Sequence, residues 1–202
     1  MLDRHMTPLI KPAIESIARS LVRTGLRADH VTVLAFGLGL IAMLCIAFRA
    51  YLVGAAFILL SRLCDALDGA VARQTEPTDA GGYLDITLDF LFYASIPLAF
   101  AIVSPKTNAL PAAVLLTAFM GTSASFLAFA ALAAKRGVES VEYPDKSFYF
   151  LGGLAEATET LICFILMCLF PKWFPVFAYS FAAICAITIA TRIVGGYHTL
   201  KK

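Results

Sequence analysis

The chain has 202 residues, of which 60% are hydrophobic and 15% are charged, and its formal net charge is +2. Soluble proteins average about 45–50% apolar and about 25% charged residues, so this composition excludes a disordered chain and an ordinary soluble enzyme. The small net charge gives no sign of a nucleic-acid partner. We expect an all-α, polytopic membrane protein that forms a single domain over residues 1–202.

Residues 9–24 are expected to form an amphipathic helix that lies on the membrane surface. Apolar residues recur along this segment at helical spacing, namely Ile10, Ile14, Ile17 and Leu21. Charged residues, including Lys11 and Arg19, fill the other side of the helix, as in helices that lie in the membrane interface. The alternative is a soluble extension of the first membrane span.

Six apolar stretches predict six membrane-spanning helices, because a helix needs about 20 mostly apolar residues to cross the hydrocarbon. The expected spans cover residues 31–48, 50–71, 82–103, 110–134, 148–170 and 174–191. With six spans, one side of the membrane carries twelve Lys and Arg residues and the other carries three, with Arg62 inside a span. Cytoplasmic loops are rich in these residues, so we expect both termini to be cytoplasmic, in a bacterial inner membrane.

Placing an acidic side chain inside the membrane costs free energy, so each such residue suggests a functional site. Six fall within the expected spans: Asp65, Asp68, Asp85, Asp89, Glu156 and Glu159. The first two are three residues apart and share a helix face, and Asp85 and Asp89 are four apart and share a face of the next helix. Residues 73–81 form a short link with glycine and proline breakers. We therefore expect two antiparallel neighbours whose four aspartates face one another in two layers.

Four facing carboxylates cannot all stay ionised without cations. Arg62 and Arg73 supply at most two positive charges, so divalent ions would supply the rest. Oxygen ligands favour Mg²⁺ or Mn²⁺, and two ions suit four carboxylates. The alternatives are structural Asp–Arg pairing, an ion- or proton-coupled transporter that uses paired acids, an intramembrane prenyltransferase, and a catalytically silent homologue.

The segment 65–73, followed by Gly81, Asp85 and Asp89, resembles the signature of the CDP-alcohol phosphatidyltransferases. That signature reads D-x-x-D-G-x-x-A-R and then, after a short gap, G-x-x-x-D-x-x-x-D. The resemblance implies that the chain moves the phosphatidyl group of a CDP-linked lipid, expected to be CDP-diacylglycerol, to an alcohol and releases CMP. This activity belongs to phospholipid biosynthesis.

The chain departs from the family pattern in its spacing. Seven residues separate Arg73 from Gly81, one fewer than is usual, so either Gly81 or Gly82 is the second glycine of the motif. Residues 28–32 resemble a second family pattern, P-N-x-x-T, more weakly, and Thr32 is the position that matches it.

The family's functional residues carry over by position. Asp65, Asp68 and Asp85 would hold the metal ions, and Asp89 would complete the metal site and act as the catalytic base. The residues that would bind the CDP-lipid are Gly69, Ala72, Arg73, Gly81 and Thr32. The resemblance also implies a homodimer, and small residues of the fourth span would permit close packing, namely Gly121, Ala124, Ala128 and Ala131.

The acceptor pocket is expected beside the fifth span, lined by Lys146, Glu156 and Glu159. Phosphate-bearing acceptors call for clusters of Arg or Lys, whereas this region offers Lys146 and at most Arg192 beside two acids, so a neutral or cationic alcohol is favoured. The alternative is that both acids only bond to their helix neighbours. Other polar residues are assigned to helix packing or to the membrane interface, namely Thr122, Ser123, Ser125 and Arg192.

Overall fold

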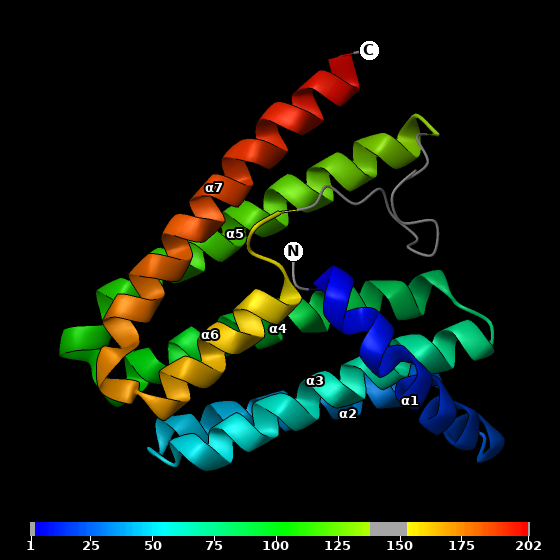
Figure 1. Ribbon diagram of the computed structural model, residues 1–202, viewed down its shortest axis with the longest axis horizontal. Coiled ribbons are helices and arrows are strands. Elements are labelled where there is room, and N and C mark those ends of the chain that lie inside the picture. Colours follow the sequence, from blue (N-terminus) through cyan, green and yellow to red (C-terminus); the bar gives the residue numbers. More distant parts are fainter. Residues whose placement is uncertain (1–2, 138–152, 202) are drawn as a thin grey trace.

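The computed structural model describes residues 3–137 and 153–201, and helices make up almost all of both stretches (Figure 1). In chain order the helices are α1 (Asp3–Arg23), α2 (Ala28–Ala47), α3 (Tyr51–Gln74), α4 (Asp79–Val103), α5 (Pro105–Lys135), α6 (Ala157–Leu169), the short 3-10 helix η1 (Pro171–Trp173) and α7 (Phe174–Lys201). The all-helical expectation is confirmed for the described part of the chain.

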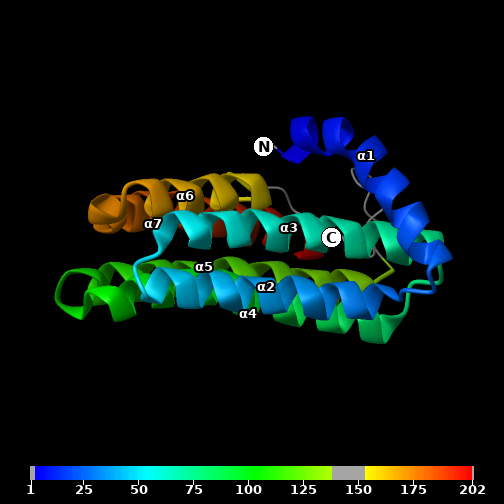
Figure 2. The ribbon, with the colours of Figure 1, turned by 90° about the horizontal axis from the view of Figure 1, so that it is seen from below.

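The membrane-type helices pack into a bundle around an aromatic core. Helix α2 packs on both α3 and α4, α5 packs on α4 and α7, and α6 packs on α3 and α7. Figure 2 shows α3 between α6 on one side and α2 on the other. The largest fully buried side chains include Phe92, Phe100, Phe164 and Phe174, and the rings of Phe100 and Phe174 stack at 4.6 Å. These contacts fix α4 against the C-terminal half of the chain.

Four described helical segments are long and apolar enough to cross a membrane: Ala28–Ala47, Asp79–Val103, Pro105–Lys135 and Pro171–Lys201. The other two predicted spans, residues 50–71 and 148–170, contain the helices α3 and α6, but neither helix is both long and apolar enough to count as a membrane span. Helix α3 carries Arg62, Asp65 and Asp68 in its second half, and α6 has only 13 residues. The count of six spans therefore stays a prediction.

A helix covers the segment expected to be amphipathic, although α1 begins at Asp3 rather than near residue 9. Ile14 and Ala18 are buried, whereas Ile10 and Ile17 are 46% and 45% exposed. The two buried residues pack against a small cluster at the ends of α2 and α3, made of Val31, Leu67, Ala70 and Val71. Helix α1 is thus docked on α3, and an apolar flank of it remains uncovered.

The two aspartate-bearing helices are antiparallel and joined by a short link, as expected, but their backbones pack mainly on α2 rather than on each other. Ser61 of α3 donates a hydrogen bond to the carbonyl oxygen of Ala35 in α2 at 2.8 Å. One helical turn further along α2, a Cβ atom on Gly39 would collide with the ring of Phe92 of α4 and would also lie 3.4 Å from the Ser61 hydroxyl. Because α2 holds both helices, α3 and α4 meet through their polar side chains.

The expected fifth span, residues 148–170, is wrong at its start. Residues 148–152 lie outside the described part of the chain, and the helix begins only at Ala157. Before it, the backbone N–H groups of Leu154 and Ala155 donate to the hydroxyl of Thr188 in α7, at 3.1 and 3.0 Å. These tertiary hydrogen bonds satisfy backbone donors without a helix. Glu156 therefore sits at the N-cap with extended backbone, and the expectation that it shares a helix face with Glu159 is wrong.

The last helix also differs from its predicted bounds. The expected span ends at residue 191, but α7 continues without a break to Lys201. Arg192 consequently lies inside the helix, and it is only 8% exposed. The assignment of Arg192 to the membrane interface is therefore wrong, because its side chain turns into the bundle.

Candidate active site

Three of the predicted aspartates meet between α3 and α4. Carboxylate oxygens of Asp65, Asp68 and Asp85 all lie within 4.8 Å of one another. Asp65 and Asp68 come from one face of α3, and Asp85 comes from the second turn of α4, just after the link. The spacing of the sequence thus places three oxygen ligands at one point.

The fourth aspartate, Asp89, is held by an arginine instead. Arg62 donates a hydrogen bond from Nη1 to Oδ1 of Asp89 at 2.5 Å, and the same nitrogen lies 3.3 Å from Oδ1 of Asp65. The Arg62 guanidinium also lies over the ring of Phe92, at 3.9 Å from its centre, and the side chain is only 11% exposed. Arg62 therefore balances charge between the two carboxylates and fixes Asp89 beside the cluster.

The donor set fits a divalent cation. One oxygen of Asp68, Oδ2, is buried and has no hydrogen-bond partner within the described stretches. A buried carboxylate oxygen without a partner is costly, and a bound cation would remove that cost. Hard oxygen ligands from three carboxylates are typical of Mg²⁺ and Mn²⁺ sites.

The structure distinguishes the two candidate glycines of the motif. A Cβ atom on Gly81 would lie 3.0 Å from Oδ1 of Asp29 and 3.1 Å from Oγ1 of Thr78, whereas one on Gly82 would meet nothing within 4 Å. The N–H of Gly81 donates to the Thr78 hydroxyl, which caps α4. Only Gly81 lies where a side chain would disturb the start of α4.

The other residues implied to bind the CDP-lipid lie near the cluster. Thr32 of α2 is 5% exposed, and its side chain lies beside Asp68. On α3, Gly69 and Ala72 follow Asp68 by one and four residues, and a Cβ on Gly69 would come within 3.4 Å of Nη1 of Arg73.

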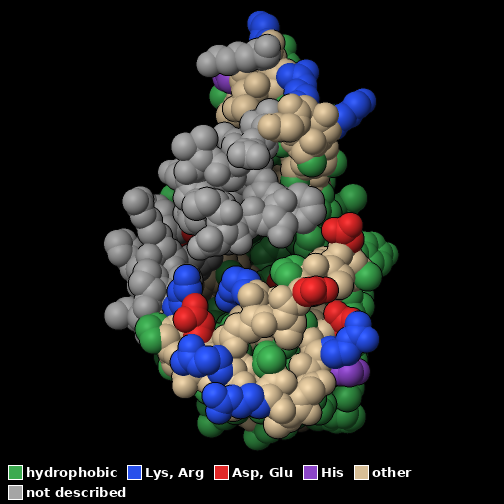
Figure 3. Space-filling model, turned by 90° about the vertical axis from the view of Figure 1, so that its right-hand side faces the viewer, with side chains coloured by type: hydrophobic (Ala, Val, Ile, Leu, Met, Phe, Trp, Pro, Cys, Tyr) green, Lys and Arg blue, Asp and Glu red, His purple; other side chains and the backbone are tan. Residues whose placement is uncertain are grey.

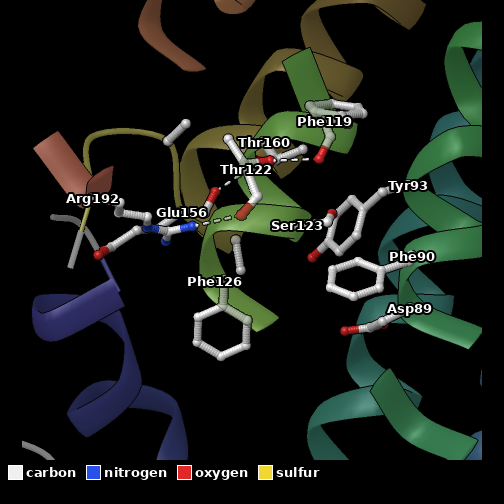
Figure 4. A pocket seen from close by; sticks show the side chains of 12 residues that line it. Asp89, Phe90, Tyr93, Phe119, Thr122, Ser123, Phe126, Glu156, Thr160 and Arg192 are labelled. Carbon is white, nitrogen blue, oxygen red and sulfur yellow. Dashed lines mark hydrogen bonds between the residues drawn. The ribbon is translucent and has the colours of Figure 1, made fainter. Parts of the chain in front are cut away.

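A cavity of about 260 Å³ opens beside Asp89. Figure 4 shows Asp89, Phe90 and Tyr93 of α4 on one side of this cavity and Glu156 with Arg192 on the other. The remaining lining residues come from α5, from the segment just before α6 and from the start of α6, and they are Phe119, Thr122, Ser123, Phe126, Ala155, Ala157 and Thr160. Of the four motif aspartates, Asp89 lines this cavity, and Asp65, Asp68 and Asp85 do not.

The three residues predicted to line the acceptor pocket differ in where they lie. Glu156 lines the cavity, and Glu159 does not belong to its lining. Lys146 lies outside the described residues. Thr122 and Ser123, which the sequence assigns to helix packing, form part of the wall, although the Thr122 hydroxyl donates to the carbonyl oxygen of Phe119 at 2.8 Å.

Arg192 lines this cavity, although the sequence analysis places it first at the membrane interface and only secondarily beside Lys146. Its guanidinium donates to the carbonyl oxygen of Thr122 at 3.2 Å and lies 5.8 Å from the centre of the Phe126 ring. The available signal was the basic residue itself, which follows an apolar run without a glycine or proline to end the helix. Helix continuation would have placed Arg192 inside the bundle.

Comparisons with known proteins agree with this geometry. The family model for CDP-alcohol phosphatidyltransferase matches residues 26–194. The inner membrane protein YnjF of Escherichia coli is 52% identical over 201 residues, which cover 100% of this chain and 98% of that protein. An archaetidylinositol phosphate synthase of Methanothermobacter thermautotrophicus is 41% identical over 85 residues, or 42% of each protein.

Solved structures share the fold. The phosphatidylinositol phosphate synthase of Mycobacterium tuberculosis with CDP-DAG bound aligns with a TM-score of 0.72 and 24% identity, over 91% of this chain and 93% of that one. The same enzyme in complex with manganese and citrate aligns with a TM-score of 0.72 and 23% identity, over 91% and 88%. At this level of identity the likeness concerns the fold alone.

Proposed function

Because this chain belongs to the CDP-alcohol phosphatidyltransferase family, we propose that its aspartate site takes CDP-diacylglycerol and passes the phosphatidyl group to an alcohol. The chain is a transferase of phospholipid biosynthesis that uses a CDP-linked lipid and an alcohol. Family membership also removes the transporter alternative.

The proposed reaction exchanges one bond to phosphorus for another. The oxygen of the acceptor hydroxyl forms a bond to the lipid phosphorus, and the bond from that phosphorus to the bridging oxygen of CMP breaks. CMP leaves with the electron pair, and the hydroxyl proton passes to a base. A divalent ion, when bound, would neutralise charge on the pyrophosphate and on the departing CMP.

The residues of this chain have separate tasks in that exchange. Asp65, Asp68 and Asp85 would hold one or two Mg²⁺ or Mn²⁺ ions. Asp89 would accept the proton, since it lies at the border between the cluster and the cavity. Arg62 would orient Asp89 through their hydrogen bond.

One observation carries this proposal: Asp89 is tied through Arg62 to the aspartate cluster and also forms part of the cavity wall. A base needs to reach both the acceptor hydroxyl and the site of attack, within hydrogen-bond distance. The direct test is metal-dependent release of CMP from CDP-diacylglycerol by the purified protein.

The cavity beside Asp89 is the proposed acceptor site. Its charged lining residues are the carboxylates Asp89 and Glu156 and the guanidinium of Arg192. A guanidinium with a carboxylate close by is a weaker site for a phosphate than an arginine or lysine cluster. We therefore keep a neutral or cationic alcohol as the proposed acceptor, to be compared in matched pairs such as glycerol with glycerol 3-phosphate and inositol with inositol phosphate.

Glu156→Gln is expected to raise the acceptor KM several-fold and to leave the KM for the CDP-lipid nearly unchanged. The substitution keeps the shape of the side chain and removes a charge from the cavity wall, on the side away from Asp89. Steady-state kinetics with each substrate varied in turn separates the two effects. Glu159→Gln is the matched control, since Glu159 is outside the lining, and an equal effect of both variants would contradict the assignment.

We propose six spans in the inner membrane, with α1 in the interface and both termini cytoplasmic. The description of the E. coli relative as an inner membrane protein supports the location. Figure 1 places α1, the link between α3 and α4 and the C-terminal end of α7 at one end of the bundle, and the link between α4 and α5 at the other. The unequal distribution of Lys and Arg assigns the first end to the cytoplasm.

Cysteine labelling tests this orientation in cells. In a variant without the five native cysteines, Glu76→Cys is expected to react with an impermeant reagent only after the inner membrane is opened. Lys106→Cys is expected to react in intact spheroplasts, because both positions are exposed, Glu76 in the link between α3 and α4 and Lys106 in the first turn of α5, at opposite ends of the bundle. Reversed accessibility would place the aspartate site away from cytoplasmic nucleotides.

A homodimer remains a proposal that rests on the family resemblance. The expected packing stripe on α5 is only partly available, because a side chain at Gly121 would come within 2.6 Å of Ile189 in α7 of the same chain. Ala124, Ala128 and Ala131 are exposed and are left for contact with a second copy. Mass determination of the protein–detergent complex tests this state.

A further inference from the structure

A basic groove lies between α1 and α3, apart from the acceptor cavity. It encloses about 560 Å³, which is within the range of about 300–1,000 Å³ common for small-molecule sites. Its lining is Lys11, Glu15 and Arg19 from α1 and Ala70, Arg73 and Gln74 from α3. Figure 3 shows Lys and Arg side chains gathered in the lower half of this face, where Figure 1 places α1 and the end of α3.

The groove carries three cations and one carboxylate. Lys11 lies 3.9 Å from Glu15, and both side chains are exposed enough for that pair to be weak. Arg19 and Arg73 have no ion-pair partner among the residues that the structure describes. Two guanidinium groups from different helices suit the oxygens of a phosphate, which accepts paired hydrogen bonds from each.

The two walls of the groove are fixed to each other. Gln74 donates a hydrogen bond from Nε2 to the carbonyl oxygen of Glu15 at 3.1 Å. Ile14 and Ala18 are buried against the end of α3, at 6% and 0% exposure. The cationic side chains therefore project from a docked pair of helices.

The groove faces away from the apolar flank of α1. Successive residues of a helix turn by about 100°, so the order around α1 is Ile17 and Ile10, then Ile14 and Ala18, and then the groove residues Lys11, Glu15 and Arg19. The middle pair contacts α3. If the exposed isoleucines lie in the membrane interface, as proposed above, the groove opens on the opposite side, toward water.

We propose that this groove binds the phosphate of a water-soluble nucleoside monophosphate, and that CMP is the ligand it takes. The inference rests on the proposed function, because that reaction releases CMP into the cytoplasm. Arg73 links the two places: its Nη1 lies beside Gly69, next to the aspartates, and its side chain also lines the groove. The groove is thus a second nucleotide site, and Arg73 lies between it and the aspartate site where CMP is released.

Calorimetric titration of CMP into the full-length protein in detergent and EDTA tests the site, because EDTA removes any metal-dependent binding of the CMP phosphate at the aspartate cluster. Arg19→Gln is expected to weaken CMP binding by about tenfold, with partial recovery in Arg19→Lys. Arg23→Gln removes the same charge from α1 outside the groove and is expected to leave binding unchanged. Cytidine is expected not to bind, and inorganic phosphate is expected to displace CMP.

Equal CMP affinity in the wild type and in Arg19→Gln would overturn the proposal. Displacement of CMP by phosphatidylglycerol in nanodiscs, lost in Arg19→Gln, would assign the groove to a lipid headgroup and would also overturn it. Neither result concerns turnover. Failure of the proposed function would show instead as an absence of CMP release from CDP-diacylglycerol with Mg²⁺ present, whatever the groove binds.

Discussion

Asp68→Asn is expected to lower the turnover of CDP-diacylglycerol by about 10³-fold or more and to abolish high-affinity binding of Mn²⁺. Asp68 is the most deeply buried member of the cluster, at 5% exposure, and one of its oxygens has no partner in the described part of the chain. The asparagine amide offers one oxygen and carries no negative charge. The ion would therefore lose one of its three negatively charged ligands.

The measurement pairs CMP release with Mn²⁺ binding followed by electron paramagnetic resonance. Asp79→Asn is the matched control, since Asp79 lies in the first turn of α4, is exposed and is outside the cluster. The control is expected to behave like the wild type in both assays. An Asp68→Asn variant with wild-type Mn²⁺ affinity would show that the ion is held elsewhere.

Asp89→Asn is expected to give a different pattern, with kcat lowered by about 10²–10⁴-fold and Mn²⁺ affinity changed only a few-fold. Asp89 is hydrogen-bonded to Arg62, whereas the three clustered oxygens belong to Asp65, Asp68 and Asp85. An amide at this position retains the shape of the side chain but cannot take the proton of the acceptor. The two assays used for Asp68 distinguish a lost base from a lost metal ligand.

Arg62→Met provides the companion variant. It removes the hydrogen bond to Asp89 and the charge beside Asp65 while keeping a long side chain over Phe92. We expect a smaller loss of kcat than in Asp89→Asn, because the base is present but no longer oriented. If Asp89→Asn loses Mn²⁺ affinity to the same extent as Asp68→Asn, Asp89 is a metal ligand and the assignment of Asp89 as the base alone is wrong.

Local spacing carried the part of the site that was predicted well. Aspartates at i and i+3 in α3 share a face whatever the rest of the protein does. A short link that contains Pro77, followed closely by Gly81 and Gly82, returns the chain alongside itself. These two facts are enough to bring Asp65, Asp68 and Asp85 together, and both can be read from the sequence.

Contacts between segments that are distant in the sequence explain the parts of the fold and of the site that were not predicted. The start of α6 depends on the Thr188 hydroxyl, which lies more than thirty residues further along the chain and accepts hydrogen bonds from Leu154 and Ala155. The pairing of Asp89 with Arg62 depends on how α2 holds α3 against α4. No period or motif in the sequence encodes either contact, and the wall formed by Arg192 depends on the packing of α5 against α7 in the same way.

Metal-dependent CMP release is the measurement that tests the central claim most directly. Purified full-length protein would be given CDP-diacylglycerol and a panel of alcohols in detergent, with Mg²⁺, with Mn²⁺ or with EDTA, and CMP would be quantified together with the new lipid. We predict equal amounts of CMP and lipid product with either metal and neither product in EDTA or in Asp68→Asn. Undiminished CMP release in EDTA, or in the Asp68→Asn protein, would contradict the account of the aspartate cluster as a metal-dependent phosphatidyl transfer site.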